Sequence, residues 1–137
     1  DRLSSRITDA VHLTAANTNL ILNVAFNYGS RAEIVGAVRK LVAAGLTAEQ
    51  IDKASISANL YTAGLPDPDL IVRTAGEFRL SNFLLWQLAY TELYFTDINW
   101  PDLTIAALHG ALADYQARER RFGKTSEQVE REAKVEC

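Results

Sequence analysis

The sequence predicts an α/β fold with a mostly parallel central sheet that is flanked by helices on both faces. Apolar runs of the length of buried strands alternate along the chain with helical patterns, which is the element order of such folds. The 137 residues are 48% hydrophobic and 23% charged, which is typical of a soluble globular domain. A chain of this length is expected to form one hydrophobic core and to bury roughly two thirds of its unfolded surface.

The first third of the chain is predicted to contain a helix, a strand and a second helix. Apolar residues recur at three- and four-residue steps from Asp1 to about Asn19, as on an amphipathic helix. Residues Leu20–Tyr28 alternate in the manner of a buried strand. Ser30 and Glu33 have capping-box spacing and predict the start of a helix that ends at Gly45. The expected core residues of this helix are Ile34, Val35, Val38, Leu41 and Val42.

The middle of the chain is predicted to hold a further helix and then a short strand. Thr47 and Gln50 repeat the capping-box spacing, and the serine-rich stretch up to position 60 is expected to continue that helix with a break. Two prolines then end regular structure. The apolar run Leu70–Val72 that follows has the size of a buried parallel strand.

The last third is predicted to contain a helix, a short strand and a final helix. Ser81 is a good N-cap for an apolar helix over Asn82–Thr91, and Leu93–Phe95 is expected to be a strand. The final helix is expected to start at Asp102 or Thr104. Its predicted core stripe consists of Ile105, Leu108, Leu112 and Tyr115. Because the helix over Asn82–Thr91 is apolar on nearly every face, we expect it to be buried in the core or at a subunit interface.

Charge and cysteine usage exclude several classes of protein. With 14 basic against 17 acidic side chains and no basic cluster, the chain is a poor candidate for binding nucleic acid or an anionic membrane. Apolar stretches stay well short of a bilayer span, and the first residues have no signal pattern. The single cysteine, Cys137, allows no internal disulfide. We therefore expect a cytoplasmic protein without a transmembrane segment.

The sequence also gives expectations for the two ends of the chain. The chain contains no methionine, so we expect the start of the gene product to be missing. Charge of alternating sign dominates the last residues, and the tail over residues 124–137 is expected to be solvated or disordered. Residues 1–123 are expected to form one part of a single domain.

A polar loop between a predicted strand and a predicted helix is the candidate site. Arg73 and Arg79 can each present a planar fork of donors to phosphate oxygens, and Ser81 adds a hydroxyl. In α/β folds, ligands bind outside the carboxyl ends of the strands, which is where this loop is expected to lie. Because its donors suit phosphate oxygens, a diphosphate is the expected ligand. The alternative is that both arginines form surface ion pairs with Asp69 and Glu77 and that Ser81 only caps a helix. The residues alone leave both interpretations open.

Glu92 is a second candidate, because it follows an apolar helix and needs a cation, a metal or solvent beside it. One carboxylate alone is weak support for magnesium. His12 and His109 have no ligand spacing and receive no metal role. The sequence has no nucleophile-elbow serine and no cysteine near a histidine, so it gives no sign of covalent catalysis. An enzyme with this sequence is expected to work by charge stabilisation.

Several long motifs in order resemble the cis-prenyltransferases, nearest to the undecaprenyl diphosphate synthase type. These motifs are Leu22–Ile34, Asp69–Asn82, Phe83–Asp97, Trp100–Asp102 and Arg118–Gly123, and they cover nearly the whole chain up to the charged tail. The resemblance implies a Mg²⁺-dependent enzyme that condenses isopentenyl diphosphate onto an allylic diphosphate such as farnesyl diphosphate. The product implied is a cis-polyprenyl diphosphate, a carrier lipid that is delivered to a membrane.

The resemblance also assigns roles to individual residues. Arg73, Arg79 and Ser81 match residues that hold the diphosphate of isopentenyl diphosphate, Glu77 lies within the same motif, and Glu92 matches a magnesium-associated carboxylate. Two residues near the end of the chain match the family's carboxy-terminal Arg-x-Gly motif. They are Arg121 and Gly123. The resemblance implies a homodimer in which this motif completes the isopentenyl site of the neighbouring subunit.

One departure from the family pattern is large. The amino-terminal half of the family, which supplies the catalytic aspartate and the allylic diphosphate site, has no counterpart here, so the amino-terminal strands of the sheet are missing and no catalytic residue is assigned in this chain. By itself the chain is expected to be inactive. Alternatives are a non-catalytic accessory subunit of a cis-prenyltransferase complex and, less in keeping with the length of the match, a plain phosphate-binding module.

Overall fold

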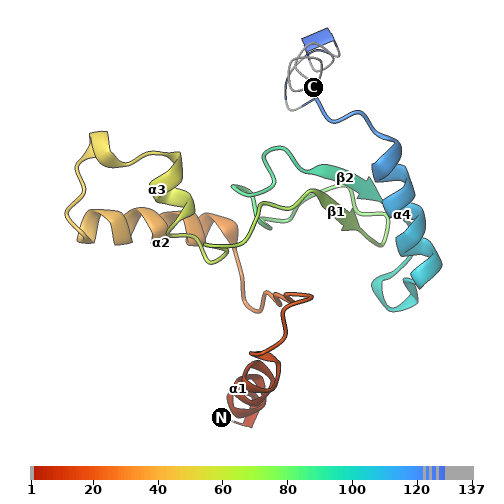
Figure 1. The fold of residues 1–137 in the computed structure, drawn as a ribbon, viewed down its shortest axis with the longest axis horizontal. Coiled ribbons are helices and arrows are strands. Elements are labelled where there is room, and N and C mark those ends of the chain that lie inside the picture. The colour runs from red at the N-terminus through yellow and green to blue at the C-terminus, as the bar shows by residue number, and fades with distance from the viewer. Residues whose placement is uncertain (1, 122, 124, 126, 129–137) are drawn as a thin grey trace.

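The computed structural model describes residues 2–121, 123, 125 and 127–128. In chain order its helices and strands are α1 (Arg2–Thr14), α2 (Ser30–Ala43), α3 (Lys53–Ser57), β1 (Leu70–Arg73), β2 (Glu92–Phe95) and α4 (Ile105–Ala117). Helix α1 stands apart from the rest, α2 and α3 lie side by side, and α4 lies beside the two strands (Figure 1). Two short 3₁₀ turns, Ala48–Gln50 and Trp100–Asp102, lie between these elements.

The two strands pair in parallel, as the sequence predicts. Leu70 is in register with Glu92 and Arg73 with Phe95, so both strands end at the same edge of the sheet. Helix α4 crosses back along β2, which makes the unit a strand pair joined by a crossover and covered by a helix. The α/β class and the parallel pairing are confirmed; β1 is one residue longer at its end than predicted, and β2 is one residue longer at its start.

The segment predicted as a strand, Leu20–Tyr28, is not one in the structure. It pairs with no other strand, it bends at Phe26 and Asn27, where Asn27 has φ +50°, and Leu20, Leu22 and Phe26 are 80%, 81% and 72% exposed. An extended segment becomes a strand only when another strand accepts its backbone hydrogen bonds, and β1 and β2 pair only with each other in the described chain. The alternating pattern therefore predicts a strand for which the described chain provides no partner.

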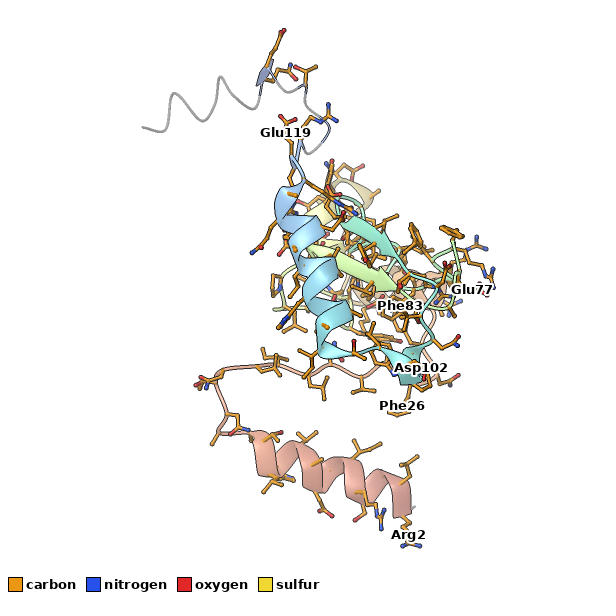
Figure 2. The ribbon with its side chains drawn as sticks, turned by 90° about the vertical axis from the view of Figure 1, so that its right-hand side faces the viewer. Arg2, Phe26, Glu77, Phe83, Asp102 and Glu119 are labelled. Carbon is orange, nitrogen blue, oxygen red and sulfur yellow. The ribbon has the colours of Figure 1, made fainter. Side chains whose placement is uncertain are left out.

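Helix α1 forms as predicted but ends at Thr14 rather than near Asn19, and none of its residues is buried. Its apolar side chains face an open space whose other wall is the irregular segment over residues 15–26. Figure 2 shows α1 and the labelled Phe26 on either side of this space. The predicted amphipathic helix thus exists without a surface that buries it.

The start of α2 contradicts the capping-box interpretation. Gly29 is the N-cap, and Ser30 and Glu33 are 0% and 1% exposed because their side chains bond to other segments. Ser30, Glu33, Ala37 and Leu41 follow one another at helical spacing and form the buried face, whereas Val35 and Val42 of the predicted core are exposed. The predicted end is confirmed, because the N–H groups of Gly45 and Leu46 close the last turn on the carbonyls of Val42 and Leu41.

The helix predicted from Thr47 is shorter than expected. The capping box forms, with the Thr47 N–H donating to Gln50 Oε1 at 2.9 Å, but it encloses only a 3₁₀ turn. Helix α3 starts at a second box, in which Asp52 Oδ1 accepts from the Ser55 N–H at 2.8 Å and Ser55 Oγ accepts from the Asp52 N–H at 2.9 Å. The break expected before position 60 therefore lies at the start of α3.

The apolar helix predicted over Asn82–Thr91 is wrong. Ser81, Asn82 and Leu84 have φ values of +51°, +60° and +44°, a left-handed conformation that cannot begin a right-handed helix. Consecutive turns follow instead, and Leu88 and Gln87 are buried while Tyr90 is 68% exposed. Ser81 is therefore not an N-cap.

Helix α4 begins at Thr104, the second of the two predicted caps, whose hydroxyl accepts from the Ala107 N–H at 3.2 Å. The predicted core stripe is wrong, because Ile105 is 75% exposed and Leu108 and Leu112 are 40% and 42% exposed. Ala111 is the buried residue of this helix. Helix α4 contacts β2, and the residue that it buries has a small side chain.

The core is small for a chain of this size. The accessible surface is 11002 Å², about half of the roughly 22,000 Å² that an unfolded chain of this mass exposes. The expectation of two thirds burial is wrong, and every residue over 2–27 is exposed. Among the described residues, no helix is both long and apolar enough to cross a bilayer.

Candidate functional site

The carboxyl ends of β1 and β2 lead into two loops that bind each other. The Ala75 N–H donates to the Ile98 carbonyl at 2.9 Å, and the Gly76 N–H donates to the Thr96 carbonyl at 3.0 Å. Gly76 has φ +62°, and a Cβ on it would lie 3.0 Å from Asp97 Oδ1. Glycine is therefore favoured here by conformation, and a side chain would crowd the Asp97 carboxylate. The candidate loop is held in one place by backbone contacts with its neighbour.

Arg73, Glu77 and Arg79 lie together at this edge, as the sequence predicts. Arg73 Nη2 is 3.9 Å from Glu77 Oε2, and Arg79 Nη2 contacts the same oxygen. The side chains of Arg73 and Arg79 are 35% and 66% exposed, and Arg73 Nε is buried without a hydrogen-bond partner. Two guanidinium groups share one carboxylate, so the group carries a net positive charge and free donors. Figure 2 shows Glu77 at the outer edge of the loop.

The predicted ion pairs of the structural alternative form only in part. Glu77 pairs with both arginines, but Asp69 lies at the other end of β1 and pairs with Arg120. Exposed ion pairs of this kind are weak, about 0–1 kcal/mol, so a stronger anion can replace the carboxylate. The geometry is thus compatible with anion binding and does not reduce the loop to a surface ion pair.

The end of the loop is tied to the start of α2. The Asn82 carbonyl accepts from the Ser30 N–H at 2.9 Å, and Asn82 Oδ1 accepts from the Arg31 N–H at 3.0 Å. Gly29 leaves room for this side chain, because a Cβ there would lie 2.9 Å from Asn82 Nδ2. The left-handed Ser81 therefore sits between the arginine loop and the first amides of α2.

Behind this junction lies a buried polar cluster that the sequence interpretation missed. The Glu33 carboxylate accepts from the Tyr28 hydroxyl, from the Tyr61 N–H at 2.7 Å and from Gln87 Nε2 at 3.4 Å. Burial and the adjacent Glu33 raise the pKa of Tyr28 above its ordinary value. Ser30 Oγ accepts from the Leu85 N–H at 2.9 Å. The available signal was the helical spacing that places Ser30 and Glu33 on the face of Ala37 and Leu41.

Glu92 lies at the opposite end of the sheet from Arg73. Glu92 is in register with Leu70, three positions before the pair of Arg73 and Phe95, a separation of about 10 Å along the strands. Its Oε2 accepts from Arg118 Nη1 at 3.0 Å, so the cation that the sequence required beside Glu92 is an arginine. The structure does not bring Glu92 together with Arg73 and Arg79.

Arg121 and Gly123 also lie away from the arginine loop. They follow the end of α4, and Arg121 is 57% exposed with its Nε 4.0 Å from Glu119 Oε2. Gly123 has φ +80°. In Figure 2, Glu119 and Glu77 mark the two separate regions. Within this chain, these two residues do not join the group around Glu77.

The described residues do not by themselves fit a metal ion. No group of three or more His, Cys, Asp or Glu side chains that could hold a metal occurs among them. Mg²⁺ binds through one or two carboxylates together with waters and substrate phosphates. The one candidate here, Glu92, is engaged by a guanidinium. A metal at Glu92 would compete with that ion pair.

Comparison with known proteins gives a consistent result. A family model described as undecaprenyl diphosphate synthase matches residues 1–123. An isoprenyl transferase of Geobacter sulfurreducens is 49% identical over an alignment of 131 positions that covers 93% of this chain and 53% of the relative. A (2E,6E)-farnesyl-diphosphate-specific ditrans,polycis-undecaprenyl-diphosphate synthase of Pseudomonas aeruginosa is 51% identical over an alignment of 139 positions that covers 98% of this chain and 55% of the relative.

Solved structures agree with the sequence matches. The lavandulyl diphosphate synthase of Lavandula x intermedia, in complex with dimethylallyl diphosphate, matches with a TM-score of 0.84 and 44% identity. The match covers 89% of this chain and 54% of that one. An undecaprenyl diphosphate synthase of Campylobacter jejuni matches with a TM-score of 0.77 and 34% identity. The chain spans about half the length of the curated relatives that it matches.

Proposed function

The chain belongs to the undecaprenyl diphosphate synthase family of cis-prenyltransferases, and from this membership we propose that the whole protein condenses isopentenyl diphosphate with an allylic diphosphate such as farnesyl diphosphate. The product is a cis-polyprenyl diphosphate of the undecaprenyl type, a carrier lipid used at a membrane. The observation that carries the proposal is the pair of arginines that share Glu77 at the carboxyl ends of the strands. This chain supplies the isopentenyl side of the site.

The arginine loop is proposed to bind the diphosphate of isopentenyl diphosphate. Arg73 and Arg79 each offer a planar fork that fits phosphate oxygens, and a diphosphate bears more charge than the Glu77 carboxylate that they share. Ser81 adds a hydroxyl donor at the junction with α2, and Glu77 keeps the two cations close while the site is empty. The loop therefore positions the substrate, and its arginines stabilise the negative charge.

The reaction itself is proposed to begin with loss of the allylic diphosphate. The isopentenyl double bond then attacks the resulting cationic carbon, a new carbon–carbon bond forms, and a proton leaves to give the cis double bond. We assign no catalytic residue in this chain, and the resemblance places the catalytic aspartate in the family's amino-terminal half. The residues described here bind and orient one substrate.

Mg²⁺ is proposed as the cofactor of the whole enzyme, where it would neutralise diphosphate charge. Glu92 is the residue of this chain that the family resemblance assigns to it, although in the structure Glu92 is paired with Arg118. Arg121 and Gly123 are proposed to reach the isopentenyl site of a second subunit in a homodimer, since they lie away from the loop of their own chain. A cytoplasmic location is proposed with this function.

The domain assignment also remains a proposal. Residues 1–123 are proposed as the carboxy-terminal part of a cis-prenyltransferase domain, which agrees with the extent of the family match. The charged tail over residues 124–137 lies almost entirely outside the described residues. The accessory-subunit alternative is not favoured, because the curated relatives are named as isoprenyl transferases and undecaprenyl-diphosphate synthases.

The test is an assay of the whole protein, not of this chain alone, with farnesyl diphosphate and labelled isopentenyl diphosphate in the presence of Mg²⁺. Wild type is expected to form labelled polyprenyl diphosphate, and Arg79→Gln is expected to raise KM for isopentenyl diphosphate by about tenfold or more. The control is Arg39→Gln, on an exposed position of α2, which is expected to behave as wild type. Failure of wild type to incorporate label, with intact folding by circular dichroism, would contradict the proposal.

A further inference from the structure

The chain leaves α4 at Arg118 in a defined direction. Ala117 is the last residue of the helix, and Arg118 is extended, with φ −83° and ψ 142°. The Arg118 N–H still closes on the Tyr115 carbonyl at 3.2 Å. The backbone therefore turns from helix to extended structure within one residue, and whatever fixes Arg118 fixes the path that follows.

The Arg118 guanidinium is held from three sides. Its Nε and Nη2 donate to Asp114 Oδ2 at 2.8 and 2.5 Å, one turn back on α4. Its Nη1 donates to Glu92 Oε2 at 3.0 Å and to the Leu93 carbonyl at 2.9 Å, at the start of β2. The side chain is 30% exposed, and these partners raise the pKa of Arg118. The planar fork thus joins the end of α4 to the amino end of the sheet.

Arg120 makes a second attachment of the same kind. Its Nη1 donates to Asp69 Oδ1 at 2.7 Å, just before β1, and to the Tyr115 hydroxyl at 2.8 Å. Side chains of an extended segment alternate between its two sides, so Arg118 and Arg120 face the sheet together. Arg121 then faces the other way, and it is 57% exposed while Arg120 is 27% exposed.

We propose that Arg118 is a positioning residue, which together with Glu92 and Asp114 fixes the direction in which Arg121 and Gly123 leave α4. The inference rests on the proposed function, which places Arg121 and Gly123 at a substrate diphosphate of a second subunit. It also gives Glu92 a role of its own, as the counter-ion of Arg118. Glu92 then acts on substrate binding through Arg118 and the end of α4 as well as through the Mg²⁺ that the proposed function assigns to it.

The planar shape of arginine is essential to this role. A lysine at position 118 keeps the charge, but its single ammonium group cannot donate to Asp114, Glu92 and the Leu93 carbonyl in fixed directions. Arg118→Lys therefore separates positioning from charge. Its matched control is Arg39→Lys, an exposed arginine of α2.

The first experiment is a double-mutant cycle on KM for isopentenyl diphosphate. Arg118→Lys is expected to raise KM about fivefold with kcat within about twofold of wild type, and Arg121→Ala is expected to raise it more. If Arg118 acts through Arg121, the double variant has the KM of Arg121→Ala alone. A multiplied effect in the double variant, or an unchanged KM in Arg118→Lys, would overturn the inference.

The second experiment does not require activity. Hydrogen–deuterium exchange of the segment over residues 116–121 is measured in wild type, Arg118→Lys, Arg118→Ala and Arg39→Lys. Both position-118 variants are expected to exchange about tenfold faster in this segment, with the far side of the molecule at α2 unchanged. Unchanged exchange in folded Arg118→Lys would overturn the inference that Arg118 fixes this segment. A wild type without turnover but with this exchange pattern would instead overturn the proposed function and leave Arg118 as the fixing residue.

Discussion

The two ends of the parallel sheet use the same residue types in opposite ways. At the carboxyl end, Arg73 and Arg79 share the single carboxylate of Glu77. At the amino end, Arg118 has both Glu92 and Asp114 as partners, and the neighbouring arginine pairs with an aspartate. At the carboxyl end, two guanidinium groups share one paired carboxylate. At the amino end, each guanidinium group has at least one carboxylate of its own.

The difference teaches that arginine pairing alone does not identify a binding site. What matters is whether the donors of the guanidinium are already used, since an anion can bind only to donors that remain or that a weak partner releases. At the carboxyl end the partner is shared and the loop is exposed, whereas at the amino end the donors are distributed over fixed acceptors. We therefore expect the carboxyl end to bind an anion and the amino end to fix the protein's own segments in place.

The largest expected effect tests this contrast directly with inorganic pyrophosphate. Arg73→Gln removes one of two cations at the carboxyl end, so pyrophosphate affinity is expected to fall about tenfold to a hundredfold by isothermal titration calorimetry. Arg120→Gln at the amino end is expected to leave affinity within about twofold. Equal losses in the two variants would break the comparison.

Stability is expected to show the reverse order. Arg118→Gln removes charge-assisted bonds to two carboxylates, Glu92 and Asp114, whose side chains are 29% and 46% exposed, and it is expected to lower the free energy of unfolding by about 1–2 kcal/mol in urea. Arg79→Gln, with a side chain 66% exposed, is expected to change it by less than about 0.5 kcal/mol. A greater loss in Arg79→Gln would reverse the assignment of the two ends.

Two adjacent positions of the arginine loop give a smaller, paired prediction. Gly76→Ala places a Cβ at φ +62° and 3.0 Å from Asp97 Oδ1, so it is expected to cost about 1 kcal/mol. Ala75 already has φ +63°, and Ala75→Gly is expected to stabilise the protein by about 0.5 kcal/mol. Urea unfolding of both variants checks the sign, and matching signs would show that the left-handed backbone does not control the loop.

The smallest effect concerns alkaline pH and the junction behind the loop. The pKa of Tyr28 is raised above 10.0 in the folded chain, by burial first and then by Glu33. Its contribution to stability is therefore fully present below pH 10 and is lost as pH rises through the raised pKa, because the unfolded chain releases this proton first. Tyr28→Phe is expected to flatten the fall in urea midpoint above about pH 10. Tyr94→Phe serves as the control, and an unaltered fall in Tyr28→Phe would contradict the assignment.

Local chemistry made much of the fold predictable. The apolar runs of β1 and β2, the Thr104 cap and the closing turn at Gly45 each depend on a few neighbouring residues, and each is found where the sequence places it. The gathering of Arg73, Arg79 and Glu77 follows equally from one short loop after a strand. Such features require no knowledge of distant segments.

Features that depend on distant segments were not predictable. Ser30 and Glu33 look like a capping box, but bonds to residues 28 to 55 positions away draw both side chains inward. The partner of Glu92 is 26 positions away, so the sequence could require a cation there without identifying Arg118. For Leu20–Tyr28, the pattern predicts an extended backbone, while pairing depends on a neighbouring strand that the described chain does not provide.

The buried carboxylate of Glu33 has a consequence for the order of folding. Its bonds to Tyr61 and Gln87 span 28 and 54 positions, so they close large loops, whereas the turns of α2 around it close locally. Loop closure costs entropy before such contacts stabilise the chain, so these bonds should be absent from an early transition state. Removing them with Glu33→Ala should therefore speed unfolding far more than it slows refolding. The residue that joins three segments of the native chain would then govern how long the native state lasts, while the local helix governs how fast it is reached.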